Sequence, residues 1–260
     1  DFAAADHVRG TITWFERTRA KPVATKPSNL SQATDGSGRV TFQTTISDAD
    51  FETAKIRIQY SLDGSAWEKP WLTKVTADNG AVDLKNSNGF QVGTANGIDT
   101  DGNSEVTLTM TWDTKTTKNT GGALSGDFEK VQLRITPRDG VGDGDRVVSS
   151  QFREDNKAPS GFGPLTLSSI GDESANLSWS RASDSSSYSY RLYYGTDHAA
   201  VLEQRSLVWD ADDDPDMNDV DNTSTTVTGL STGKSYTFKL NAVGEFGNQV
   251  DVPSGKEFDS

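Results

Sequence analysis

Every second residue is apolar in a series of short runs along this sequence. These runs lie at residues 40–46, 56–62, 106–112 and 131–135, and Thr, Gln, Lys or Arg fill many of the positions between. Because successive side chains of a β-strand point to opposite faces, a period of two predicts strands with one buried and one solvent-facing side. Turns are predicted between the runs at Asp35-Gly36, Asp63-Gly64, Asn79-Gly80, Asp101-Gly102 and Asp139-Gly140. No stretch of helical length shows a period of 3.6, so the pattern predicts an all-β chain of antiparallel β-sandwiches.

The chain length and a polar segment at residues 154–159 predict an N-terminal arm followed by two tandem β-sandwiches. The chain has 260 residues, which suits one large domain or two ordinary ones. The segment 154–159 is polar and ends in Pro159, which cannot donate to a strand ladder. We therefore expect an N-terminal arm at 1–29, a first sandwich at 30–155 and a second at 156–260.

Charge and cysteine content exclude several classes of partner. The net charge is −13 and there is no cysteine. An acidic chain repels nucleic acid and anionic membranes, so we expect neither as a partner. No apolar run is long enough to span a bilayer, so this segment is not expected to insert into a membrane. A cysteine-free, acidic, β-rich chain favours an extracellular or cell-surface protein of bacterial or archaeal type.

The N-terminal arm carries its own strand pattern. Val8, Ile12 and Trp14 alternate with polar residues, and the first 30 residues hold five basic and three acidic side chains. The rest of the chain then carries a net charge of −15. Such an arm can add a strand to an exposed sheet edge of a neighbouring molecule, with Val8, Ile12 and Trp14 as its contacts. The alternative is that it forms the first strand of its own domain.

The C-terminal half resembles the fibronectin type III family. Residues 229–242 read GLSTGKSYTFKLNA, in which a leucine precedes a turn and Tyr236 opens a strand. The resemblance implies that the Tyr236 hydroxyl returns to the backbone as a tyrosine corner. Trp179 resembles the tryptophan of the family's second strand, and residues 190–194 look like its third. Thr232 stands where the family usually has proline.

The N-terminal half resembles bacterial immunoglobulin-like or fibronectin-like surface repeats. Residues 60–67 look like a hairpin of those repeats, and residues 136–140 with 155–159 resemble the way they end. A long insertion is expected near residues 76–103. Modules of this kind serve as spacers, adhesive surfaces, polymer subunits and enzyme accessories, so the fold does not select the function.

Acidic loops suggest calcium. One loop places oxygen-bearing side chains at relative positions 1, 3, 5, 7, 9 and 12, and Ca²⁺ takes six to eight oxygen ligands. Its candidate ligands are Asp210, Asp212, Asp214, Asp216, Asn218 and Asp221. Pro215 stands where an EF-hand needs glycine, so this is not an EF-hand loop. The alternative is a solvated acidic loop.

Further acidic groups are weaker candidates. Asp99, Asp101, Asn103 and Glu105 could hold Ca²⁺ or simply form a hairpin turn, and Asp139, Asp143 and Asp145 lie in a Gly-rich turn. Asp155 and Asn156, with Glu154, resemble the junction residues with which cadherin-like chains clamp Ca²⁺. The alternative there is a plain flexible linker.

The sequence favours binding or structural functions over catalysis. There are two histidines, His7 and His198, in unrelated contexts, and no nucleophile elbow, zinc-protease or phosphate-loop motif occurs. We expect a non-enzymatic subunit or repeat region of a surface filament, fibre or layer, which binds copies of itself or other surface proteins. The alternative is an adhesin or a carbohydrate-binding accessory region of a larger secreted protein or polysaccharide-degrading enzyme. Its glycan would stack on aromatic residues, for which the candidates are Trp67, Trp71, Trp209 and Phe246.

Overall fold

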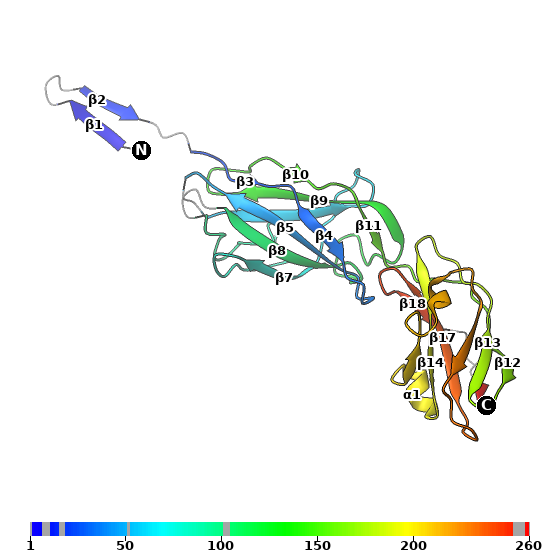
Figure 1. Cartoon of the computed structure of the whole chain (residues 1–260). Helices are drawn as coiled ribbons and strands as arrows, with labels where there is room; N and C mark the ends of the chain where they lie inside the picture. Colours follow the sequence, from blue (N-terminus) through cyan, green and yellow to red (C-terminus); the bar gives the residue numbers. More distant parts are fainter. Residues whose placement is uncertain are drawn as a thin grey trace. The chain divides into compact units, whose positions relative to one another are not determined.

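The protein is almost entirely β-structure. The computed structural model describes residues 2–6, 11–15, 19–50, 53–100, 105–251 and 258–259. Within these ranges the helical elements are α1 (His198–Leu202) and a short 3₁₀ turn, η2 (Pro215–Asn218) (Figure 1). The predicted all-β class is confirmed. The short helix α1 arises because the side chain of Asp197 caps the backbone N–H of Ala200, although five residues are too few to show a period of 3.6.

Two compact units make up the chain, and neither is a continuous stretch of sequence. The first unit comprises residues 1–31, 40–122 and 130–152. The second comprises residues 32–39, 123–129 and 153–260. Each unit is described here by itself.

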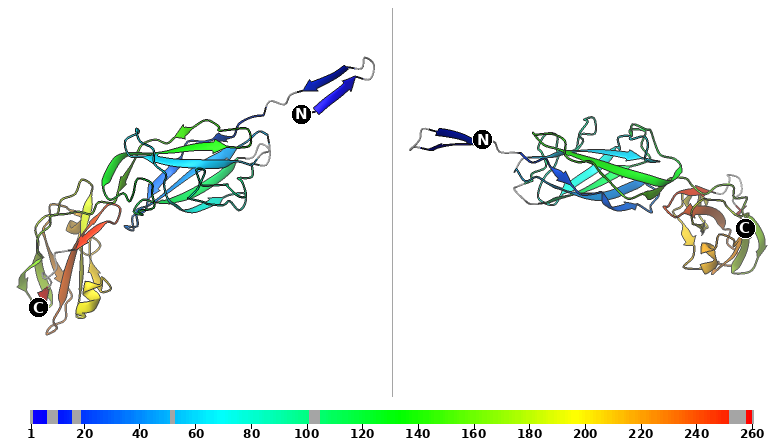
Figure 2. Two further views of the ribbon diagram at one scale, coloured as in Figure 1. Left: turned by 180° about the vertical axis from the view of Figure 1, so that it is seen from behind. Right: turned by 90° about the horizontal axis from the view of Figure 1, so that it is seen from above.

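The first unit is built on two antiparallel sheets, which Figure 2 shows from two further directions. One sheet has the order β3-β5-β8-β7, and β4 also pairs with β5. The other sheet has the order β10-β9-β11, and β6 also pairs with β9. The last residues of β4 and β11 and the first residues of β9 belong to the second unit. The strands are β3 (Val23–Ala24), β4 (Ser28–Gln32), β5 (Arg39–Ser47), β6 (Lys55–Ser61), β7 (Leu72–Ala77), β8 (Val106–Asp113), β9 (Asp127–Arg138), β10 (Val147–Val148) and β11 (Phe152–Asp155).

The core of the first unit lies between these sheets. The rings of Tyr60 on β6 and Trp112 on β8 pack with their centroids 4.6 Å apart, so side chains of the two sheets meet. Alternate residues of four strands are buried, as the period of two predicts. The apolar members are Val40, Phe42, Ile46, Ile56, Ile58, Tyr60, Val106, Leu108, Met110, Trp112, Val131, Leu133 and Ile135.

The expected insertion covers an edge of the second sheet. Between β7 and β8 no named strand is formed by the described residues, but isolated bridges join Val92 to Ile56 and Ile98 to Ala54. The fully buried side chain of Gln91 accepts from the backbone N–H of Ile58 (2.9 Å) and donates to the carbonyl of the same residue (3.0 Å). The insertion therefore satisfies backbone groups that an edge strand would otherwise leave unpaired.

The second unit contains a three-stranded sheet facing a larger one. The small sheet has the order β12-β13-β16, and the large one the order β15-β14-β17-β18, with β19 also paired to β17. The strands are β12 (Thr166–Ile170), β13 (Ser174–Ser178), β14 (Tyr188–Gly195), β15 (Leu207–Trp209), β16 (Ser224–Thr228), β17 (Thr237–Gly244), β18 (Gln249–Asp251) and β19 (Phe258–Asp259). Their shared core includes Leu177, Trp179, Tyr190, Val227, Phe238 and Leu240.

The turn before β17 has the geometry that the resemblance implies. The hydroxyl of Tyr236 accepts a hydrogen bond of 3.0 Å from the backbone N–H of Ser231. This bond lowers the pKa of the Tyr236 hydroxyl, because the donor favours the phenolate. Leu230, just before the turn, is buried in the core. The predicted tyrosine corner is confirmed.

The N-terminal arm forms a hairpin of its own. β1 (Phe2–Asp6) pairs antiparallel with β2 (Thr11–Phe15), in a register that places Phe2 opposite Phe15 and Asp6 opposite Thr11. Among the described strands these two pair only with each other. Val8 lies outside the described residues, while Ile12 and Trp14 are part of β2.

Candidate functional site

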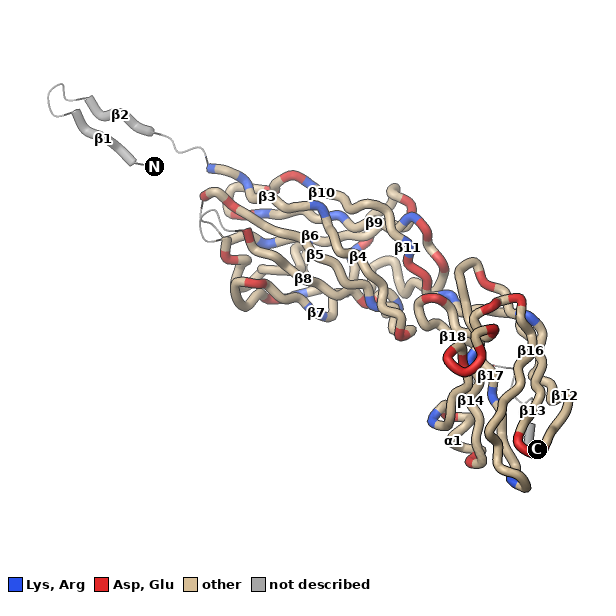
Figure 3. Tube along the Cα trace, in the orientation of Figure 1, with Lys and Arg blue, Asp and Glu red and all other residues tan. Residues whose placement is uncertain are grey.

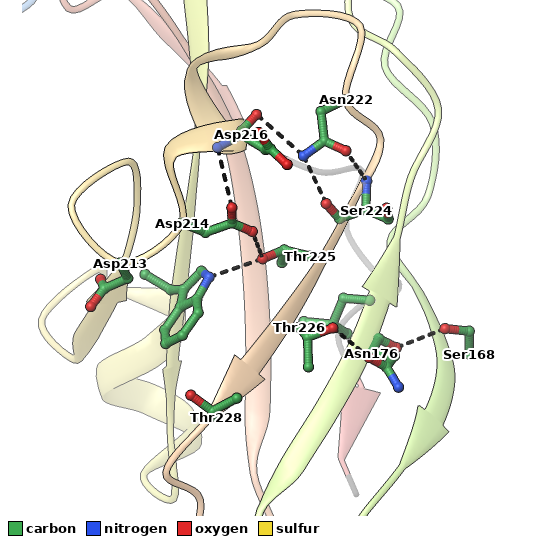
Figure 4. Close-up of a pocket in the computed structure, with 12 residues that line it drawn as sticks. Ser168, Asn176, Asp213, Asp214, Asp216, Asn222, Ser224, Thr225, Thr226 and Thr228 are labelled. Atoms are coloured by element: carbon green, nitrogen blue, oxygen red, sulfur yellow. Dashed lines mark hydrogen bonds between the residues drawn. The ribbon is translucent and has the colours of Figure 1, made fainter.

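A polar hollow lies on the second unit beside the three-stranded sheet. Its volume is about 630 Å³ and its lining is rich in hydroxyl, amide and carboxylate groups. Figure 4 shows side chains from β13, β16 and the acidic loop 210–221 gathered around it. The lining residues are Ser168, Asn176, Leu177, Trp209, Asp213, Asp214, Asp216, Asn222, Ser224, Thr225, Thr226 and Thr228.

One wall of the hollow is held by a chain of hydrogen bonds. The indole Nε1 of Trp209 donates to Thr225 Oγ1 (2.9 Å), and that hydroxyl donates to Asp214 Oδ2 (2.6 Å). The second oxygen of Asp214 accepts from the backbone N–H of Asp216 (3.2 Å) and begins the 3₁₀ turn η2. The strand, the tryptophan and the loop are thus fixed relative to one another within this unit.

The opposite wall is also preorganised. Thr226 Oγ1 donates to Asn176 Oδ1 (2.6 Å) across β16 and β13. Asn222 Nδ2 donates to the carbonyls of Asp216 (3.2 Å) and Ser224 (2.9 Å), which ties the end of the acidic loop to β16. These contacts, drawn in Figure 4, leave an open recess with many hydrogen-bonding groups and few apolar ones.

The acidic loop 210–221 is anchored by an apolar residue, Met217. Met217 is fully buried in the core of the second unit, while its neighbours Asp216 and Asn218 are exposed. A buried methionine between exposed polar residues holds the loop against the sheets by apolar packing. Because the sequence of this loop is dominated by acidic residues, the burial of Met217 was not predicted.

Three of the six candidate calcium ligands of this loop, Asp210, Asp214 and Asp221, contact protein groups through their side chains. Side-chain oxygens of Asp210 and Asp214 accept from the backbone N–H groups of Asp212 (3.1 Å) and Asp216. Asp210 also lies 3.6 Å from Arg191, and Asp221 lies 2.7 Å from Arg181. Figure 3 shows that acidic residues gather mostly in loops of this kind. In the part of the chain that the structure describes, no group of three or more acidic or histidine side chains is arranged to hold a metal.

The second acidic group is only partly described. Asp101 and Asn103 lie outside the described residues, whereas Asp99 and Glu105 lie inside them. The backbone carbonyl of Asp99 accepts from Asn79 Nδ2 (2.7 Å). Calcium at Asp99, Asp101, Asn103 and Glu105 stays a prediction.

The segment 154–156 is buried and hydrogen-bonded inside the second unit. Gln32 bonds through its amide to both the N–H and the carbonyl of Asp155 (2.9 and 2.8 Å). Asn248 donates to the same carbonyl (2.7 Å), and Ser186 donates to the carboxylate of Asp155 (2.9 Å). Asn156 Nδ2 donates to the carbonyl of Leu124 (2.9 Å). Hydrogen bonds from other residues of the protein therefore hold residues 154–156 in place. The sequence predicted this segment to be either a calcium clamp or a flexible linker.

The candidate aromatic residues have different surroundings. Trp209 lines the hollow. Trp67 and Trp71 are half-buried, and each has a cation over one ring face: the Arg134 guanidinium is 4.2 Å from the Trp67 ring centroid and Lys118 Nζ is 4.7 Å from that of Trp71. Phe246 is half-buried in a turn, and its backbone carbonyl accepts a hydrogen bond from the N–H of Gly36 (2.9 Å). Trp209 is thus the candidate that adjoins a recess lined with hydrogen-bonding groups.

The histidine that the structure describes contacts a threonine hydroxyl. His198 Nδ1 lies 3.2 Å from Thr237 Oγ1, at the start of α1 and β17. His7 lies outside the described residues. Among the described residues, the structure also has no helix that is both long and apolar enough to cross a membrane.

Comparison with known proteins identifies a domain family in the second unit. Residues 157–254 match the fibronectin type III domain family. The sequence matches no curated protein. Similar solved structures include domains FN1–FN3 of chicken CNTN1, with a TM-score of 0.44 and 12% identity over 99% of this chain and 75% of that one. Domains A168–A170 of titin have a TM-score of 0.40 and 13% identity, over 88% of this chain and 62% of that one.

Fibronectin type III and immunoglobulin-like domains are typically extracellular and non-catalytic, and they are common in adhesion and structural proteins. The sheet orders, the tyrosine corner and the family match agree: residues 157–254 form a fibronectin type III domain.

Proposed function

We propose that this chain is a non-catalytic part of a bacterial or archaeal cell-surface assembly, and that it joins further copies through its N-terminal hairpin. The observation that carries the proposal is the pairing of β1 and β2 with each other alone among the described strands. Each strand of such a hairpin keeps one edge of backbone N–H and C=O groups free for another partner. An isolated two-stranded hairpin is only marginally stable in water, so a third strand from a neighbour would stabilise it.

A second copy offers a matching acceptor. β7 stands at the end of the sheet order β3-β5-β8-β7, and Thr73, Lys74 and Thr76 on it are exposed. A hairpin added there would extend the sheet by main-chain hydrogen bonds. The basic arm and the acidic remainder of the chain also attract each other. A head-to-tail contact of this type grows a filament when its rotation does not close into a ring, and a filament is what we propose.

The test compares the full chain with one lacking residues 1–22. Mass measurement by light scattering and electron microscopy should show concentration-dependent oligomers for the full chain and monomers for the truncated one. Thr13→Pro removes a donor from β2 and should also give monomers, whereas the matched Thr13→Val keeps strand propensity and should still associate. A truncated chain that associates like the full chain would refute the proposal.

Binding of a neutral glycan in the polar hollow is a second candidate function. It is favoured by the recess itself, in which preorganised Asn, Ser and Thr groups adjoin Trp209. Hydroxyl and amide groups can both donate to and accept from sugar hydroxyls. Asp213, Asp214 and Asp216 make the recess negative, so we expect neutral or amino sugars and not uronic or sialic acids.

A glycan array read with wild-type protein tests this second function. Asp216→Ala and Thr228→Ala remove lining groups from exposed positions and should abolish any signal, while Thr76→Ala, on the first unit, should leave it unchanged. An array without hits, or hits that survive both lining substitutions, would remove the hollow as a glycan site.

A further inference from the structure

Two buried aspartates meet at one end of the first unit. Asp48 follows directly after β5 and Asp139 directly after β9, and their side chains are 1% and 7% exposed. The carboxyl group of Asp139 lies within hydrogen-bonding reach of that of Asp48. The Oδ2 atoms of both residues are buried, and neither finds a hydrogen-bond donor among the described residues.

The other oxygen of each carboxylate is held by backbone groups. Asp48 Oδ1 accepts from the N–H of Asp50 (2.9 Å). Asp139 Oδ1 accepts from the N–H groups of Val141 (2.7 Å) and Gly142 (2.8 Å). These bonds orient both carboxylates, because each is attached to its loop by one oxygen and directs the other inward.

Neither Asp48 nor Asp139 takes part in an ion pair among the described residues, and Arg138, which precedes Asp139 in sequence, lies 2.9 Å from Asp143 instead. Asp50, a third nearby carboxylate, accepts from the N–H of Ala20. Two adjacent buried negative charges are strongly unfavourable without a counter-ion.

The geometry points to a divalent cation, Ca²⁺, bound between Asp48 Oδ2 and Asp139 Oδ2. A cation satisfies both orphaned oxygens at once and removes the repulsion between them. Loop carbonyls and water would supply the remaining oxygen ligands, as is common in irregular calcium sites. Mg²⁺ is disfavoured because it gives up its water shell reluctantly, and both carboxylate oxygens are buried.

This site is distinct from the acidic loops that the sequence singled out. It uses Asp139 from the predicted Gly-rich turn, but its partner is Asp48, about 90 residues earlier, and not Asp143 or Asp145. With two carboxylates, its affinity is expected in the range of extracellular calcium modules, with a Kd of about 10⁻⁴–10⁻³ M. It depends neither on hairpin exchange nor on glycan binding.

Thermal unfolding of the full chain in EDTA and in 10 mM CaCl₂ tests the site. Calcium should raise the Tm of the wild type by several degrees, since ligand binding to the folded state stabilises it by mass action, and Mg²⁺ should raise it less. Asp48→Asn and Asp139→Asn should each abolish the calcium shift. Asp48→Asn should also have a higher Tm than the wild type in EDTA, because its amide can donate to Asp139 Oδ2.

Two control variants locate the effect. Asp143→Asn removes an exposed carboxylate from the same loop, and Asp212→Asn with Asp216→Asn removes two from the acidic loop; both proteins should keep the calcium shift. The inference is overturned if the shift survives in Asp48→Asn and Asp139→Asn, or if the acidic-loop variant loses it. It is equally overturned if calcium has no effect on the Tm of the wild type. A Tm that then rises on acidification from pH 7 to 5 would mean that the two carboxyls share a proton.

Discussion

The hydroxyl of Tyr236 illustrates how single polar atoms organise this protein. It accepts from the Ser231 N–H and so closes the turn that leads into β17. Carboxylates act similarly: Asp63, Asp83 and Asp139 each accept from backbone N–H groups of a loop. At the scale of residues, polar side chains therefore accept hydrogen bonds from the backbone of turns. The hydrophobic pattern alone does not specify the conformation of these turns.

Tyr236→Phe should lower the Tm of the fibronectin type III domain by a few degrees, because the Ser231 N–H loses its acceptor while the ring keeps its packing against Phe238. Calorimetry of the full chain measures the effect. Tyr194→Phe is the matched control, since its ring also stacks near Phe238, and it should change the Tm little. Equal losses in the two variants would contradict the assignment of the corner.

The Asp127–Arg153 pair should make stability depend on acidity. Two hydrogen bonds join the groups (2.8 and 2.7 Å), and the bond from Arg153 holds the pKa of Asp127 below its usual value of 3.8, against the opposing effect of burial. A carboxyl with a lowered folded-state pKa stabilises the protein above its unfolded pKa, and this contribution is lost as the pH falls through the folded value. Asp127→Asn should therefore cost about 1–2 kcal/mol at pH 7.

Urea unfolding at pH 7 and at pH 3 checks this sign. The difference in unfolding free energy between wild type and Asp127→Asn should shrink at the lower pH, where the wild-type carboxyl begins to protonate. A difference that stays constant between the two pH values would show that Asp127 contributes by packing and not by charge.

Sheet edges are the critical feature at the scale of elements. The insertion between β7 and β8 covers β6 through the side chain of Gln91, and it also reaches β7, where the side chain of Asn86 accepts from the N–H of Leu72 (3.0 Å) and donates to its carbonyl (2.7 Å). An edge that is covered is protected from pairing with another chain, and one that is left open is available for it. Beyond Leu72, β7 ends its own sheet order with Thr73, Lys74 and Thr76 exposed, and this stretch is the acceptor that we propose.

Gln91→Ala should cost about 2–4 kcal/mol, because it leaves both the N–H and the C=O of buried Ile58 without partners. It should also raise the tendency to aggregate by uncovering the edge of β6. Gln43→Ala is the control: Gln43 bonds to Asn29 and Thr109 near the surface, and its loss should cost under about 1 kcal/mol. Denaturant unfolding with light scattering measures both effects, and similar results for the two variants would count against the edge-covering function.

At the scale of the molecule, the chain divides into two compact units, and the described residues of each unit include buried apolar side chains. One core contains Leu133 and the other Leu240, and both side chains are fully buried. Units with separate cores generally unfold as separate cooperative transitions.

Leu133→Ala and Leu240→Ala should each cost about 2–5 kcal/mol, but in different transitions. Differential scanning calorimetry of the full chain should show that each variant lowers one transition and leaves the other in place. If both transitions move together in both variants, the units unfold as one cooperative body.

Sequence patterning by itself determined the long central strands and their buried faces. The period of two at Val40, Ile58, Leu108 and Leu133 identifies buried faces, because strand geometry is local and needs no knowledge of the partner strand. The resemblance to the fibronectin type III family also predicted the tyrosine corner, whose leucine, turn and tyrosine are near neighbours in sequence. The hairpin was anticipated only as one strand, because the alternation does not reveal what pairs with it.

Only the tertiary structure decided which distant polar groups meet. Asp48 and Asp139, Gln91 and Ile58, and Gln32 and Asp155 come together because strand order and loop path place them there, and neither is encoded in local spacing. The same holds for Gly36, predicted as a turn residue: it has φ +74°, and a Cβ there would lie 2.6 Å from the Gly247 carbonyl oxygen. Burial patterns can be predicted from neighbouring residues, whereas contacts between loops depend on the path of the whole chain.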